Sequence, residues 1–129
     1  MNFSSCPQFD REFKAFSKKW RTLKDDLERA KRVIAMLYAS PVQDRDTIQK
    51  SFFDGKKATK LAQTEHYEVV KMRLDCSSGG AQGKLRLVFV FLKAKDLTVF
   101  IELYAKNDKD REDSPRIARY VASTEDRIS

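Results

Sequence analysis

The chain has 129 residues, 41% of them hydrophobic, and a formal net charge of +7 at pH 7. This length predicts a single domain over residues 1–129. The positive charge predicts an anionic partner such as nucleic acid, the ribosome or an acidic protein. One histidine and two cysteines are too few for a disulfide framework or a four-ligand zinc site, so we expect a reducing cytoplasm and no metal. The longest unbroken apolar run, Leu87 to Leu92, is too short to span a bilayer and no signal peptide opens the chain, so no membrane association is expected.

A short strand and a pair of helices are predicted for the N-terminal third. Met1 to Cys6 has the character of a strand, which Pro7 ends. Thr22 and Asp25 resemble a capping box and indicate a second helix start. A single long helix or a coiled coil also suits the apolar spacing, but we favour a helical hairpin because a long exposed stripe would have no partner in a small chain. The apolar residues at spacings of four and three, which share one helical face, are Phe9, Phe13, Phe16, Trp20, Leu23, Leu27, Ala30, Ile34 and Leu37.

The segment 42–65 is polar and mixed in charge, and no element is placed in it from the sequence. Its apolar anchors are Ile48, Phe52 and Phe53. A short helix is compatible with these anchors, but its position stays open.

Three segments in the C-terminal half alternate apolar and polar residues as β-strands do. They are Glu68 to Asp75, Lys84 to Leu92 and Thr98 to Lys106. The glycine-rich loop 77–83 joins the first two segments, and a short turn over 93–97 joins the last two. We therefore expect an antiparallel meander.

The meander brings polar side chains to one surface of the sheet. Because successive side chains on a strand point to opposite faces, strict alternation places Val99, Ile101 and Leu103 together on the third strand. The opposite surface, which suits a phosphodiester, gathers Lys71, Arg73, Arg86, Glu102, Tyr104 and Lys106.

A final helix completes the predicted order of elements. Ser114 followed by Pro115 is typical of an N-cap and a first helical position. Ile117, Tyr120 and Val121 then form a small apolar face. A strand, a two-helix hairpin, a three-stranded meander and a C-terminal helix predict an α+β fold, with a small antiparallel sheet and the helix pair on one of its faces.

In this order and spacing, the chain resembles the RelE/ParE superfamily of bacterial type II toxin–antitoxin systems, and specifically its RelE-like members. The opening strand and first helix, the three sheet strands and the charged tail are all similar. The segments that carry the resemblance are Ser5 to Phe9, Val70 to Leu74, Gly83 to Phe89, Ile101 to Lys106 and Asp108 to Glu112.

The resemblance implies one fold but more than one function. RelE-like members are endoribonucleases that cut messenger RNA on the ribosome, with no cofactor, and a cognate antitoxin silences them. ParE-like members share the fold but inhibit DNA gyrase without enzymatic activity. A basic RNA- or protein-binding module without toxicity is a third alternative. For a toxin, the expected partners are the ribosome, messenger RNA and an acidic, partly disordered antitoxin that folds on binding.

RNA cleavage without a metal uses the ribose 2′-OH as the nucleophile on the adjacent phosphate. It needs a base near that hydroxyl, cations at the phosphoryl oxygens and an acid at the leaving 5′-oxygen. By the resemblance, Arg86 holds the phosphate, for which a bidentate guanidinium is suited. Lys71 and Arg73 then bind neighbouring phosphates.

The resemblance implies further roles on the third strand. Tyr104 positions or stacks on a base, or relays a proton, and Lys106 lies where the family often has a catalytic basic residue. Glu102 is an alternative base on the same predicted face, although a lysine with a lowered pKa also suits that role.

Each of these residues also has a purely structural interpretation. Arg73 and Glu102 suit a cross-strand ion pair, and Tyr104 suits a half-buried packing position. Lys71 and Lys84 suit solvated edge positions that oppose strand aggregation, although Lys84 also joins the predicted RNA contacts. The remaining predicted RNA contacts, which otherwise form a solvated helix face, are Lys18, Lys19 and Arg21.

Overall fold

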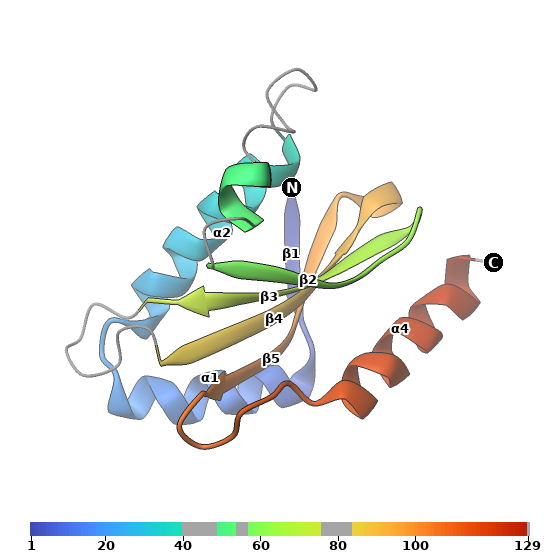
Figure 1. Cartoon of the computed structure of the whole chain (residues 1–129). Helices are drawn as coiled ribbons and strands as arrows, with labels where there is room; N and C mark the ends of the chain where they lie inside the picture. The colour runs from blue at the N-terminus through green and yellow to red at the C-terminus, as the bar shows by residue number, and fades with distance from the viewer. Residues whose placement is uncertain (40–48, 54–56, 76–83, 129) are drawn as a thin grey trace.

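The computed structural model describes residues 1–39, 49–53, 57–75 and 84–128. Its main feature is a five-stranded sheet with helices on both faces (Figure 1). A short helical segment lies at 49–53, and a single 3-10 turn, η1, covers Lys93–Lys95. The other elements are β1 (Asn2–Ser5), α1 (Pro7–Lys19), α2 (Leu23–Ala39), β2 (Ala58–Gln63), β3 (Tyr67–Leu74), β4 (Leu85–Leu92), β5 (Leu97–Ala105) and α4 (Ser114–Ile128).

The predicted helical hairpin is confirmed. Pro7 occupies the start of α1, where its missing N–H costs no hydrogen bond. The α1 helix ends at Lys19, and α2 begins after a short turn. The Thr22 hydroxyl donates a hydrogen bond to the carboxylate of Asp26 (2.9 Å). The partner of Thr22 at this helix start is therefore Asp26 and not the predicted Asp25.

The α+β fold class is confirmed, and the sheet has the order β1-β5-β4-β3-β2. The strands β3, β4 and β5 form the predicted antiparallel meander, and their bounds differ from the predicted ones by at most one residue. The expectation of a wholly antiparallel sheet is wrong, because β1 runs parallel to β5. An apolar pattern within a strand carries no information about the direction of its neighbour.

The edge strand β2 is absent from the sequence-based prediction. It pairs antiparallel with β3 and has a bulge between Lys60 and Ala62. Among its six residues, only Ala58 is fully buried, so the strand lacks the alternation that identifies a half-buried strand. The 49–53 helical segment agrees with the short helix left open above, whereas residues 42–48 and 54–56, like the loop 77–83, lie outside the described residues.

The sheet separates two hydrophobic clusters. One face packs against α1 and α2, and residues such as Leu23, Ile34 and Phe89 are at most 2% exposed there. The other face packs against α4 through Ile117 and Val121. The central strand β4 is buried along its whole length because helices cover both of its faces.

A β-bulge changes which β5 side chains share a face. The register with β4 shifts between Val88 and Phe89, so that β5 carries an extra residue at this point. Ile101 therefore lies in the cluster beneath α4 together with Tyr104, whereas Leu103 lies in the cluster beneath α1 and α2. Strict alternation along β5, which would group Ile101 with Leu103, is wrong for this reason.

An ion pair between a buried arginine and a partly buried glutamate joins both helix layers to β5. β1 pairs with residues 97–100 of β5, and the Glu12 carboxylate of α1 accepts a hydrogen bond from the Leu103 amide beyond them (3.1 Å). The Arg116 guanidinium of α4 donates to both oxygens of Glu12 (2.9 and 3.0 Å) and to the Ile101 carbonyl. Two side chains thus satisfy backbone groups of β5 that β1 does not reach.

Candidate functional site: a cationic row on the sheet

The strand register places three of the predicted residues directly opposite one another. Arg73 of β3 faces Arg86 of β4, and Arg86 faces Tyr104 of β5. Directly opposed residues have Cβ atoms about 5 Å apart, so the three side chains adjoin on one face. In the next row Lys71 and Glu102 flank Val88. The structure therefore brings together five of the six strand residues singled out from the sequence.

Arg86 lies at the centre of the row and is only 9% exposed. One of its guanidinium nitrogens donates to the Leu85 carbonyl (3.1 Å). Burial lowers the pKa of Arg86 from its ordinary value, and the neighbouring charge of Arg73 lowers it further. A guanidinium keeps its proton in proteins nonetheless, so this position holds a permanent cation in a partly desolvated setting.

Tyr104 is 4% exposed and belongs to the cluster beneath α4. Burial raises the pKa of its phenol to about 12, and the carboxylates of Glu112 and Glu102 act in the same direction. The Lys109 ammonium lies over the ring, 5.2 Å from its centroid. The phenol is therefore neutral at physiological pH and is a hydrogen-bond donor beside Arg86.

The raised pKa of Tyr104 predicts a pH dependence of stability. Because the folded-state pKa of about 12 lies above the ordinary value of 10.0, the stabilisation linked to this proton is present below pH 10.0 and is lost as the pH rises towards about 12. We expect the free energy of unfolding to fall less steeply over this window for Tyr104→Phe than for the parent protein. Urea titrations across the window measure the difference, and equal slopes would contradict the assignment.

Glu102 is fully buried and takes part in a local network. Its carboxylate pairs with Lys109 and accepts a hydrogen bond from the Asp113 amide (2.8 Å). Arg73 lies in the row of Arg86 rather than in that of Glu102, and no ion pair joins Arg73 to Glu102 within the part of the chain that the structure describes. The expected cross-strand pair is therefore wrong, and the Glu102 carboxylate supports the segment before α4.

Two residues of that segment were not predicted as site residues. Glu112 forms an ion pair with Lys71 (3.0 Å), and Lys109 contacts both Glu102 and Tyr104. Burial raises the pKa of Glu112, but a backbone hydrogen bond and the Lys71 ammonium outweigh it and leave the pKa below its ordinary value. The only sequence signal for these contacts was the alternation of charges over 108–112, and this pattern does not specify which strand residues the charged side chains contact.

Lys84 and Lys106 lie at the end of the site where β4 begins and β5 has just ended. The Lys106 amide donates to the Lys84 carbonyl (2.7 Å), and both residues are exposed. Together with the exposed Arg73, they place three accessible cations near the buried guanidinium of Arg86.

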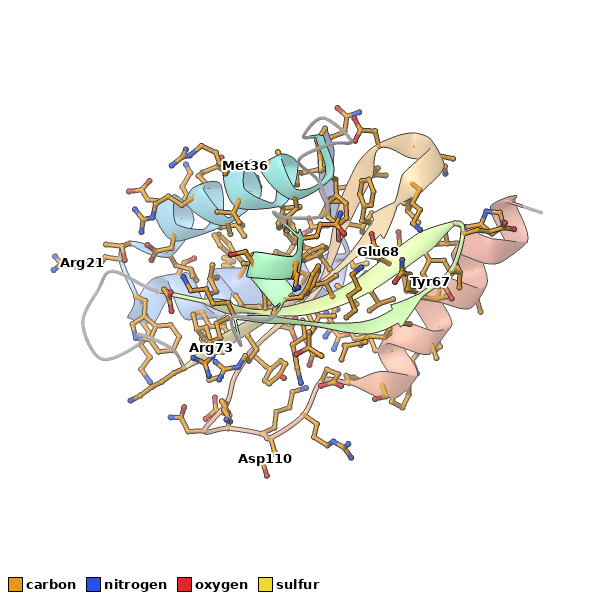
Figure 2. The ribbon with its side chains drawn as sticks, turned by 45° about the horizontal axis from the view of Figure 1, so that its top comes forward. Arg21, Met36, Tyr67, Glu68, Arg73 and Asp110 are labelled. Atoms are coloured by element: carbon orange, nitrogen blue, oxygen red, sulfur yellow. The ribbon has the colours of Figure 1, made fainter. Side chains whose placement is uncertain are left out.

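The three predicted RNA contacts on the helical hairpin, Lys18, Lys19 and Arg21, are separate from this row. Lys18 and Lys19 are exposed in the last turn of α1, and Arg21 is exposed in the turn that follows. Figure 2 shows Arg21 and Arg73 towards the same end of the molecule. The α1 helix packs on the opposite face of the sheet from Tyr104, so these cations do not join the row itself.

A mostly apolar cavity of about 450 Å³ adjoins the site beneath α4. Tyr67 and Val69 of β3, Val121 of α4, and Glu112 are among the residues that line it. Among the described residues, no three His, Cys, Asp or Glu side chains gather in a way that suits a metal ion. In the same part of the chain, no helix is long and apolar enough to cross a membrane.

The architecture is similar to that of a chain in the archaeal RelE–RelB complex from Pyrococcus horikoshii. The match has a TM-score of 0.51 and 15% sequence identity, and it covers 84% of this chain and 97% of that chain. The chain matches no protein-family model and no curated protein sequence. At this identity the similarity shows the fold, and the expected RelE-like fold is confirmed.

Proposed function

We propose that the protein is the toxin of a toxin–antitoxin pair and cleaves messenger RNA on the ribosome, as a metal-independent endoribonuclease of the cytoplasm. The observation that carries this proposal is the row formed by Arg73, Arg86 and Tyr104 on adjacent strands. Two guanidinium groups and a neutral phenol that adjoin on one face of the sheet suit a phosphodiester, because they offer both charge and hydrogen-bond donors to its oxygens.

The burial of each group suggests its role in the reaction. Arg86, desolvated and permanently charged, binds the scissile phosphate. It stabilises the charge that develops as the 2′-OH loses its proton to a water molecule, bonds to phosphorus and displaces the 5′-oxygen. Exposed Arg73 binds the adjacent phosphate, and Lys71 extends the same track. Tyr104, whose pKa is raised to about 12, keeps its proton at physiological pH and is therefore suited to donate a hydrogen bond to the leaving 5′-oxygen or to the phosphate.

The exposed lysines suit contacts beyond the scissile linkage. Lys84 and Lys106 flank the open end of the row, where they can follow the RNA backbone. Lys18, Lys19 and Arg21 face solvent on the helical hairpin and suit ribosomal RNA. The affinity that such contacts provide falls as the salt concentration rises, because binding releases counterions from the RNA.

The proposed protein partner is an acidic antitoxin. The structural neighbour comes from a RelE–RelB complex, and the net charge of +7 in the present chain favours a partner of opposite sign. A partly disordered segment that folds over the cationic row would block RNA access and so silence the toxin.

Induced expression in bacteria tests the proposed function. We expect growth arrest, with new messenger RNA 5′ ends inside translated codons and unchanged plasmid supercoiling. Supercoiling defects and DNA damage without such ends would instead indicate a gyrase inhibitor of the ParE type. The absence of both effects would indicate a non-toxic binding module and would overturn the proposal.

A further inference from the structure

The segment 107–113, between β5 and α4, returns across the cationic face of the sheet. We infer that this covering segment is autoinhibitory: in the free protein the Glu112 carboxylate occupies the anion position at Lys71 that a phosphate of RNA takes. RNA then binds only as it displaces Glu112. The inference rests on the proposed function and adds an internal competitor to it.

The contact between Lys71 and Glu112 carries the inference. The ammonium and the carboxylate are 3.0 Å apart and belong to residues 41 positions apart in the chain. Their side chains are 27% and 15% exposed, so the contact lies at the surface of the site and is reachable from solvent. A phosphate oxygen makes the same charge-assisted hydrogen bond to an ammonium as a carboxylate oxygen does, so the two ligands compete for Lys71.

A second contact of the covering segment shields the neighbouring part of the site. Lys109 pairs with the buried Glu102 and lies 5.2 Å from the centroid of the Tyr104 ring. Tyr104 is in the row of Arg86. The covering segment thus contacts both rows of the site: Glu112 contacts Lys71 in the row of Val88, and Lys109 contacts Tyr104 in the row of Arg86.

The covering segment is held more firmly at one end than along its length. At Asp113 the amide donates to the buried carboxylate of Glu102, and the Asp113 side chain accepts from the Arg116 amide at the start of α4 (3.1 Å). Lys109 is held by its pair with Glu102, whose side chain is fully buried. The Lys71–Glu112 pair is partly exposed and contributes modest net stability, so the Glu112 side chain can leave Lys71 while Lys109 and Asp113 stay in place and α4 remains folded.

Binding of a short single-stranded 2′-O-methyl RNA, which lacks the attacking hydroxyl, tests the inference. Glu112→Gln should bind this probe about three- to tenfold more tightly than the parent protein, because it removes a competing ion pair of modest strength. The matched control is Asp110→Asn, which removes the same charge from the exposed outer part of the covering segment, where Figure 2 shows Asp110 pointing away from the sheet. The control should change affinity less than about twofold, as expected for a solvated charge. Fluorescence anisotropy at about 0.15 M salt, where the charge at Asp110 is screened, measures all three proteins.

A third variant, Lys71→Met, removes the contested cation. In this background Glu112→Gln should no longer tighten binding, because the carboxylate and the phosphate have nothing left to compete for. Equal effects of Glu112→Gln and Asp110→Asn would overturn the inference, since only overall charge would then matter. Slower cleavage by Glu112→Gln with unchanged affinity would also overturn it and would assign Glu112 to the chemistry.

Cleavage assays on these proteins, with Arg86→Lys added, separate this inference from the proposed function. If the parent protein cleaves ribosome-bound messenger RNA and Arg86→Lys does not, while Glu112→Gln behaves as Asp110→Asn, the covering segment is not inhibitory but the function stands. If the parent protein neither binds the probe nor cleaves messenger RNA, both proposals are overturned.

Discussion

Arg86→Lys is expected to slow cleavage of ribosome-bound messenger RNA by about 100-fold or more. The loss of one donor that stabilises transition-state charge has this magnitude in other enzymes, and lysine lacks the planar fork that contacts two phosphate oxygens at once. Because Arg86 is 9% exposed and lies between Arg73 and Tyr104, no other side chain can take its position. Single-turnover cleavage on programmed ribosomes measures the effect.

Two controls show whether the loss is specific to Arg86. Lys95→Ala removes one positive charge from the exposed η1 turn between β4 and β5, and we expect less than about a twofold change in rate. Thermal unfolding should show Arg86→Lys to be folded, since the substitution keeps the charge and most of the volume. Parent-like cleavage by a folded Arg86→Lys protein would contradict the role given to this residue.

Glu12→Ala is expected to lower the free energy of unfolding by roughly 3 kcal/mol. The substitution leaves the Arg116 guanidinium, whose side chain is 8% exposed, without the carboxylate that takes two of its hydrogen bonds. It also leaves the Leu103 amide without its acceptor. For a protein of this size, we expect the melting temperature to fall by about 10 °C. Urea and thermal unfolding measure both quantities.

The matched control for this prediction is Glu28→Ala on α2. Glu28 also pairs with a cation, Lys31 (3.1 Å), but its side chain is 52% exposed and the pair lies within one helix. We expect a loss below about 0.5 kcal/mol, as is usual for such surface pairs. Equal losses for Glu12→Ala and Glu28→Ala would show that the buried network does not hold α4 to the sheet.

The fold and the site are linked through that network. Arg116 is three residues beyond Asp113, where the covering segment ends and α4 begins. Its contacts with Glu12 and with the Ile101 carbonyl hold this junction against β5. We therefore expect Glu12→Ala to loosen the covering segment as well as to destabilise the fold.

Local patterns predicted the elements whose residues are strongly periodic. The apolar spacing from Phe9 to Leu37 predicted helix, and the lack of a partner for one long exposed stripe favoured the hairpin. The alternation in β3 placed Lys71 and Arg73 on one face. Two features had no such signal. In the edge strand β2, only Ala58 is fully buried, so the strand shows no alternation. The bulge that turns Ile101 towards α4 is not marked by any residue type in the sequence of β5.

The α+β order of elements, the meander and the cations on its strands were predictable from the sequence, because the pattern of burial within an element depends on residues close together in the chain. The parallel pairing of β1 with β5, the burial of Glu102 with Lys109 and the contact of Glu112 with Lys71 emerged from the three-dimensional structure. These features depend on partners from distant parts of the chain, such as the pair 41 residues apart. Hydrophobic periodicity specifies the face on which a residue lies, but the charged group that it meets there depends on how the segments pack.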